Sequence, residues 1–121
     1  MEKSKSFKNL LVWQKSHSTV LEIYKMTKTL PKDELFGITS QIRRSSVSIA
    51  ANIVEGFRKK SKLDKARFLN IAQGSLDETE YFLILIQDLN YADTGTLQIQ
   101  LEEVSRMLNA YYRAVINDIK Q

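Results

Sequence analysis

Residues 33–57 decide the fold, and they read DELFGITSQIRRSSVSIAANIVEGF. At helical spacing, one face of this stretch carries the apolar residues Leu35, Ile38, Ile42, Ile49 and Ile53. The small side chains of Ser45 and Ser46 lie on the same face, where they allow a neighbouring helix to approach closely. Pro31 stops the preceding segment, and Gly56 lies near the end of this one. The stretch therefore predicts an amphipathic helix with one buried face.

Three other segments have the same helical periodicity. Residues of about 10–29 present an apolar face made of Leu10, Trp13, His17, Val20, Leu21 and Tyr24. Residues of about 62–89 turn inward Phe68, Ile71, Ala72, Ser75, Thr79, Phe82 and Ile86, with Gly74 expected beside Ser75 at a close helix contact. Residues of about 94–119 present Leu97, Leu101, Val104, Leu108, Tyr111 and Val115. Ser61, with Asp64 three residues later, predicts the N-cap of the third helix.

The chain has 121 residues, the size of a single domain, and four helices of these lengths use nearly all of it. The connections between them are short, so neighbouring helices are expected to pack antiparallel. We therefore predict one all-α domain over residues 1–121, an antiparallel up-down-up-down four-helix bundle with helices at about 10–29, 33–57, 62–89 and 94–119.

The composition argues against catalysis. With 0 Cys and 1 His, the chain cannot build a thiolate site, a Cys nucleophile or a multi-histidine metal centre. The Glu-x-x-His pairs of di-iron bundles, Gly-rich phosphate loops and the Gly-x-Ser-x-Gly elbow are absent from the sequence. His17 is expected to be a buried or half-buried structural residue, and Glu78 a partly buried carboxylate that needs hydrogen-bond donors. We expect no enzyme activity, no cofactor and no metal.

The sequence shows no sign of a membrane or export segment. No stretch reaches the ~18 consecutive apolar residues of a membrane span. Residues 1–6 are polar and lack the apolar segment of a signal peptide. The absence of cysteine fits a reducing compartment, so the expected location is the cytoplasm.

The formal net charge is +4, and it is unevenly distributed. Residues 1–67 hold 15 basic and 6 acidic side chains, whereas residues 68–121 hold 3 basic and 8 acidic ones. Such a chain can present one basic surface to a polyanion, or its two halves can neutralise each other across helix contacts.

Basic side chains gather at the predicted turn between the second and third helices: Arg58, Lys59, Lys60, Lys62, Lys65 and Arg67. The N-terminus of the third helix adds a positive dipole and free N–H groups, which suit phosphate. We predict a nucleic-acid-binding site here, with Arg43 and Arg44 and the Lys-rich N-terminus as further candidates. The alternative is a solvated loop without a ligand.

Surplus apolar surface predicts self-association, because a single bundle needs only one apolar face per helix. Second apolar stripes are formed by Phe36, Val47, Ala50 and Val54, and on the first helix by Val12, Ile23, Met26 and Leu30. A neighbouring stripe with short polar side chains indicates packing against another surface: Gln41, Arg44, Ser48, Asn52 and Glu55. Arg44 and Glu55 are candidates to pair with another subunit. Alternatively, a different packing of the four helices would bury these apolar residues within the chain itself.

Several motifs resemble those of a known family. They are LLVWQ at residues 10–14, QIRRSSVSI at 41–49, NIVEG at 52–56, and FLNIAQGS at 68–75 followed by Glu78. They resemble the signatures of bacterial four-helix-bundle proteins encoded within intervening sequences of large-subunit rRNA genes, also labelled S23 ribosomal proteins. The resemblance runs from about Phe7 to Leu108, and Ser45 and Ser46 stand where an Ala pair is expected.

This resemblance implies a ring-like homopentamer and no established enzyme activity. It also implies similarity in fold to the accessory protein of diversity-generating retroelements, which binds nucleic acid and a reverse transcriptase. The predicted function is a non-enzymatic, homo-oligomeric module that binds nucleic acid, RNA in preference, through clustered basic residues. The alternative is a protein-interaction scaffold whose acidic second half recruits a partner protein such as a reverse transcriptase.

Overall fold

The computed structural model describes residues 6–120, in which the chain forms four long helices and no strand. The long helices are α1 (Leu11–Thr27), α2 (Ser40–Arg58), α3 (Lys62–Asp88) and α4 (Gly95–Lys120). Three short helical turns precede α1 and α2: η1 (Phe7–Asn9), η2 (Lys32–Glu34) and η3 (Leu35–Thr39). Residues 1–5 and 121 of the predicted domain lie outside the described residues, and so do the N-terminal lysines at positions 3 and 5.

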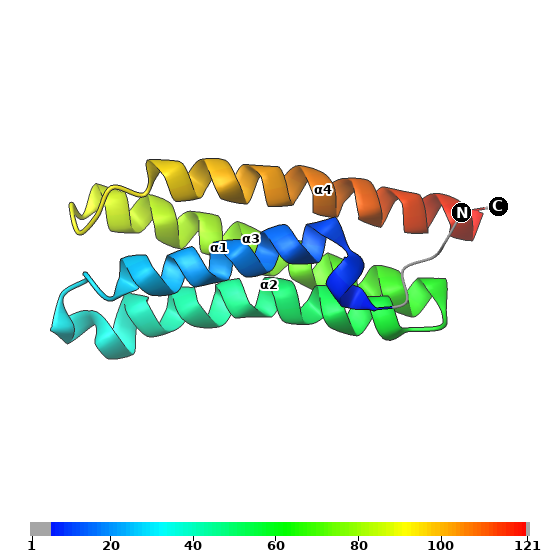
Figure 1. Ribbon diagram of the computed structural model, residues 1–121, viewed down its shortest axis with the longest axis horizontal. Coiled ribbons are helices and arrows are strands. Elements are labelled where there is room, and N and C mark those ends of the chain that lie inside the picture. Colours follow the sequence, from blue (N-terminus) through cyan, green and yellow to red (C-terminus); the bar gives the residue numbers. More distant parts are fainter. Residues whose placement is uncertain (1–5, 121) are drawn as a thin grey trace.

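The four long helices lie side by side along one axis (Figure 1). The α1–α2 and α3–α4 connections lie at one end, and the α2–α3 turn lies at the other end, near η1 and the last turns of α4 (Figure 1). No helix within residues 6–120 is both long enough and apolar enough to cross a membrane.

The predicted second helix is broken near its start. Gly37 has non-helical backbone angles, φ −108° and ψ −117°, so regular α2 begins at Ser40 and not near residue 33. A Cβ at Gly37 would lie 2.6 Å from Oε1 of Glu34, whose carboxylate accepts a 3.5 Å hydrogen bond from the N–H of Ile38. This break leaves Leu35 half exposed and Phe36 91% exposed, although Leu35 was expected in the buried face.

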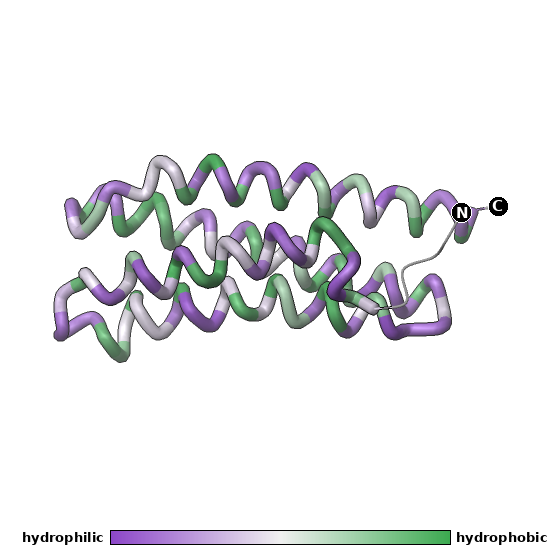
Figure 2. The backbone as a smooth tube through the Cα atoms, in the orientation of Figure 1, coloured by the Kyte–Doolittle hydropathy of each residue, from purple (hydrophilic) through white to green (hydrophobic). Residues whose placement is uncertain are grey.

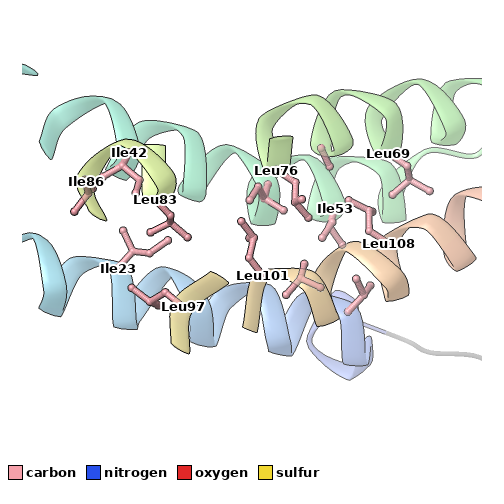
Figure 3. Close-up of a cluster of buried hydrophobic side chains, with 14 of the residues drawn as sticks. Ile23, Ile42, Ile53, Leu69, Leu76, Leu83, Ile86, Leu97, Leu101 and Leu108 are labelled. Atoms are coloured by element: carbon pink, nitrogen blue, oxygen red, sulfur yellow. The ribbon is translucent and has the colours of Figure 1, made fainter. Parts of the chain in front are cut away.

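The core runs along the whole bundle (Figure 3). Its fully buried side chains are contributed by all four helices: Ile23, Ile42, Ile49, Ile53, Leu69, Leu83, Ile86, Leu101, Val104 and Leu108. The predicted buried faces of α2 and α4 are confirmed, apart from Leu35 and the partly buried Tyr111. Figure 2 shows apolar and polar positions alternating along each helix, as this one-sided burial requires.

The predicted face of α1 is only partly confirmed: Val20 is buried and Leu10 and Trp13 are partly buried, but the face is rotated. The buried residues are Val12, Ser16, Thr19, Val20, Ile23 and Thr27, whereas His17, Leu21 and Tyr24 are exposed. Threonine can be buried here because its hydroxyl bonds to the helix itself: Thr19 donates to the carbonyl of Lys15, and Thr27 to that of Tyr24. The second stripe containing Val12 and Ile23 is therefore the core stripe.

The predicted face of α3 is rotated. Ala72, Thr79 and Ile86 are buried as expected, but Ile71 is 46% exposed, and Phe68, Ser75 and Phe82 are only partly buried. Leu69, Leu76 and Leu83 take the central positions. These leucines alternate with Ala72, Thr79 and Ile86 at spacings of three and four residues, which is the seam of a helix packed in a bundle.

Small polar residues join α2 to α3 both in the core and at its edge. The hydroxyls of Ser45 and Thr79 lie 2.8 Å apart in the core, and those of Ser48 and Ser75 lie 2.8 Å apart at its edge. Ser45, Ser46 and Ser75 thus lie at or near a close contact between helices, as predicted. Gly74 does not: it is exposed, and a Cβ built on it would meet nothing within 4 Å.

Candidate nucleic-acid interface

The turn between α2 and α3 is fixed by its own backbone and caps. Gly56 is buried at the end of α2, where a Cβ would lie 3.4 Å from atoms of Leu69, Lys65 and Phe68. Ser61 caps α3 as predicted, and its Oγ accepts a 3.2 Å hydrogen bond from the N–H of Asp64. The basic cluster is therefore held on an ordered corner of the bundle.

Lys65 has a structural role within this corner. Its Nζ donates to the carbonyls of Gly56 (2.9 Å) and Phe57 (3.0 Å) in the last turn of α2, and the Gly56 carbonyl also accepts from the N–H of Lys59. Partial burial lowers the pKa of Lys65 below its usual value. Because the ammonium is already bound to the C-terminus of α2, Lys65 is poorly placed to contact a phosphate.

Three other members of the cluster have partners within the chain. Nζ of Lys62 lies 3.5 Å from Asp118 of α4, and the guanidinium of Arg67 lies 3.5 Å from Asp64. Nζ of Lys59 lies 4.8 Å from the centre of the Phe68 ring. The two ion pairs are exposed, so each contributes at most about 1 kcal/mol, and a phosphate can displace the carboxylate at small cost.

Arg58 and Lys60 are the most available members of the cluster. Both are exposed, and neither forms an ion pair or side-chain hydrogen bond within residues 6–120. They lie on either side of Lys59, outside the packed corner.

Arg43 and Arg44 are engaged elsewhere. Nε of Arg43 donates to Oγ1 of Thr27 at 2.8 Å, and its guanidinium lies 4.7 Å from the centre of the Tyr24 ring. Arg44 donates to Glu78 at 2.7 Å within the same chain, and its predicted pairing with another subunit stays a prediction. Glu78 is partly buried as predicted, and Arg44 is its donor.

The folded chain separates charge between the two ends of the bundle. The hydrogen bond between Ser48 and Ser75 and the ion pair between Lys15 and Glu103 mark a plane across its middle. On the side of the α2–α3 turn, residues 6–15, 49–75 and 104–120 form the basic half, with 11 basic and 3 acidic side chains. Residues 16–48 and 76–103 form the acidic half, with 5 basic and 10 acidic ones.

Five basic residues outside the predicted cluster belong to this basic half. They are Lys8, Lys15, Arg106, Arg113 and Lys120, all exposed, and Lys15 forms the ion pair with Glu103. They were missed because sequence reasoning looked for a run of basic residues, whereas these come from η1, α1 and α4. The signal in the sequence is their place in the parts of η1, α1 and α4 that lie on the side of the α2–α3 turn.

The predicted oligomer-interface residues lie in two places. Val47, Ala50 and Val54 line an apolar groove between α1 and α2, together with Trp13 and Val20. Phe36 lies at the start of the second helical segment, outside this groove, and Gln41 and Glu55 are exposed. Ser48 and Asn52 are partly buried, since Ser48 bonds to Ser75 and Asn52 donates to the carbonyl of Ser48.

His17 is exposed, in contrast to the buried or half-buried position expected for it. Its ring stacks on Trp13, with centroids 5.1 Å apart and planes 5° apart, at the edge of the apolar groove. Within residues 6–120, no group of three or more His, Asp or Glu residues is placed to hold a metal ion.

These features define a small helical protein with one basic end. Residues 8–110 match the family described as 23S rRNA-intervening sequence protein, and the chain belongs to this family. A similar fold occurs in a crystal structure of a protein with unknown function from the S23 ribosomal protein family of Bacteroides thetaiotaomicron VPI-5482. The two chains share 30% identity, with a TM-score of 0.79 over 85% of this chain and 96% of that one. No curated protein matches this sequence.

Proposed function

We propose that this protein is a non-enzymatic RNA-binding module that acts as a homo-oligomer in the cytoplasm. The carrying observation is the basic half of the bundle, where 11 basic side chains face only 3 acidic ones. The family description, which refers to a 23S rRNA intervening sequence, supports RNA as the polymer. The proposed architecture is a bundle whose helices alternate in direction, up and down, with five copies assembled as a ring.

Binding would act through phosphate neutralisation. The exposed Arg58 and Lys60 provide the first contacts, and Lys62 and Arg67 can join by exchanging a weak carboxylate partner for a phosphate. Each phosphate neutralised steepens the salt dependence, by about 0.9 in log K per decade of salt for a duplex and about 0.7 for a single strand. A ring would multiply such contacts through effective concentration.

The test is fluorescence anisotropy of labelled RNA over a series of salt concentrations. Arg58→Glu with Lys60→Glu should lower the affinity and flatten the salt slope. The matched control is Lys28→Glu with Lys32→Glu, which makes the same charge change at exposed positions in the acidic half. If both double variants lose affinity equally, only net charge matters and the basic half is not the site. If the parent binds no RNA at low salt, the RNA-binding proposal fails.

Self-association would bury the apolar groove. Val47, Ala50 and Val54 are partly exposed on its floor and walls, and a groove of such residues favours burial against another copy. Light scattering of Val54→Glu should show a smaller assembly than the parent. Ile99→Glu is the matched control, because Ile99 is 68% exposed on α4, outside the groove. A parent that scatters as a 14.0 kDa monomer would overturn this part of the proposal.

The second candidate function is a protein-recruiting scaffold. The acidic half favours it, because it carries 10 acidic side chains together with the exposed apolar residues Phe36, Tyr81 and Leu89. A partner bound there would be basic and would contact apolar side chains as well. Phe36→Ala would weaken such a complex and leave RNA affinity unchanged, which separates the two functions.

A further inference from the structure

A polar cleft opens between α3 and α4, away from the α1–α2 groove. It encloses about 460 Å³ and is lined by Asn70, Gln73, Gly74, Asp77, Ser105 and Asn109, with buried leucines beneath. This volume falls in the range of small-ligand sites. The side chains around it are amides, a hydroxyl and a carboxylate, so its chemistry differs from that of the basic cluster.

The cleft exists because position 74 has no side chain. A Cβ at Gly74 would meet no atom within 4 Å, so the glycine answers no packing need within the chain. Glycine inside a helix costs about 0.5–1 kcal/mol relative to alanine. Within the single chain, the glycine's effect is to leave space between α3 and α4.

The polar groups of the cleft are partly committed. Nε2 of Gln73 donates to Oδ1 of Asn109 at 2.8 Å. Oε1 of Gln73, an acceptor, and Nδ2 of Asn109, a donor, form no hydrogen bond within residues 6–120. Asp77 follows Gln73 by one helical turn, which sets their Cβ atoms about 5–6 Å apart on the same face. The cleft therefore offers the two acceptor oxygens of the Asp77 carboxylate on α3 and one free amide donor, Nδ2 of Asn109, on α4.

This arrangement selects against phosphate. Among residues 6–120, no Lys or Arg lines the cleft, and the carboxylate of Asp77 would repel an anion. It fits a flat, neutral ligand with two adjacent N–H donors and one acceptor. Guanine has this pattern on its Watson–Crick edge: N1–H and the N2 amino group face the carboxylate, and O6 accepts from an amide N–H.

Arginines surround the cleft without entering it. Arg106 directly follows Ser105, Arg113 lies one turn beyond Asn109, and Arg67 lies one turn before Asn70. All three are exposed. These arginines would hold the phosphates on either side of a bound base. A carboxylate with neighbouring amides could also bind an arginine side chain of a peptide, but the surrounding arginines would repel such a ligand.

We propose that this cleft binds one unpaired guanine base of a single-stranded RNA. This inference rests on the proposed RNA-binding function, and it adds selection of a base to the binding of phosphates. Asp77 would accept from N1–H and the N2 amino group, the amide of Asn109 would donate to O6, and Gly74 would give the ring its space.

Ligand-observed saturation-transfer NMR with free nucleotides tests the site without RNA. GMP should receive saturation from the protein, and UMP at the same concentration should receive much less. Asp77→Asn should weaken GMP binding by about tenfold, since a bidentate base contact is lost. Gly74→Tyr, which fills the cleft, should abolish the signal, whereas the matched Gly74→Ala, which adds one carbon, should retain it.

The outcomes separate this inference from the proposed function. If GMP and UMP behave alike, or Gly74→Tyr binds GMP as the parent does, the guanine site is wrong whatever RNA does. If GMP binds selectively but an oligouridine with one central guanine binds no better than oligouridine alone, the base is not read within RNA and the inference also fails. Loss of RNA binding in Arg58→Glu with Lys60→Glu, with GMP binding kept, would locate the phosphate contacts outside the cleft and support both proposals.

Discussion

Lys65 provides the sharpest test of the structure, because the sequence groups it with phosphate-binding residues while the fold gives it a different role. Its ammonium donates two hydrogen bonds, to the carbonyls of Gly56 and Phe57 at the C-terminus of α2. Lys65→Met keeps a long, unbranched side chain of good helix propensity and removes only the charge and the donors. The substitution therefore isolates the capping contact.

The expected loss follows from these two contacts. A hydrogen bond that involves a charged group contributes about 1.5–3 kcal/mol when well buried. Lys65 is only partly buried, and its charge is also partly desolvated in the fold, so the pair together should contribute about 2 kcal/mol. The unfolding entropy is about 2.1 cal/mol/K per residue, or about 0.25 kcal/mol/K for this chain, so the Tm should fall by about 8 °C.

Two measurements on the same variants decide the matter. Thermal unfolding at one fixed protein concentration should show the lower Tm for Lys65→Met and an unchanged Tm for Lys60→Met. Anisotropy with labelled RNA should show the reverse, with weaker binding only for Lys60→Met. If Lys65→Met keeps the parental Tm and loses RNA affinity, the ammonium is a phosphate ligand and the capping argument is refuted.

Three further comparisons of variants test the packing and the loops. Gly74→Ala should raise the free energy of unfolding by about 1 kcal/mol, because its Cβ enters open space. Gly56→Leu should lower the free energy of unfolding by about 1–3 kcal/mol, because the turn around Gly56 is crowded. Denaturant unfolding of both variants checks this, and equal shifts would contradict it. Ser46→Leu, at a 1% exposed position, should lower the Tm more than Ser75→Leu, at the partly buried edge; the opposite order would mean that the faces of α2 and α3 are misplaced. The hydrogen bond to Glu34 raises the pKa of Tyr91 above its usual value of about 10, so this contact stabilises the fold fully below that value, and its contribution is lost as the pH rises from there through the raised pKa of the folded state. Unfolding curves from pH 8 to 11 should therefore converge for the parent and Tyr91→Phe, and a constant difference would exclude this linkage.

Helix number and most helix limits could be predicted from the sequence, because Pro31, Ser61 and the short polar connections act locally. The start of α2 could not, because the non-helical backbone at Gly37 moves it to Ser40. The buried faces of α2 and α4 could also be predicted, since each has one dominant run of Ile, Leu and Val at helical spacing. The predicted buried faces of α1 and α3 are rotated relative to the observed ones, because each helix carries two apolar stripes. The sequence favoured the larger side chains, such as Trp13 and Phe68, whereas the bundle buries smaller neighbours that allow close helix packing, such as Ser16 and Leu69.

The roles of the basic residues depend on the same three-dimensional information. Arg58 and Lys65 are alike in the sequence, yet one is free and the other caps α2, because the distance from Lys65 back to Gly56 is set only when α3 folds against α2. Proximity along the chain could therefore predict where charge gathers, but not which ammonium already has a partner.

The charge separation shows why spatial halves differ from sequence halves. The sequence divides at residue 67 into a basic first part and an acidic second part. The helix connections lie alternately at the two ends of the bundle, so each end receives the finish of one helix and the start of the next (Figure 1). Arg113 and Lys120, from the acidic part of the sequence, therefore join Arg58 at the basic end, while Lys28 and Lys32 are carried to the acidic end. The fold thus concentrates at one end basic residues that the sequence distributes over both parts, and a phosphate backbone would meet that end with fewer opposing carboxylates than the sequence alone suggests.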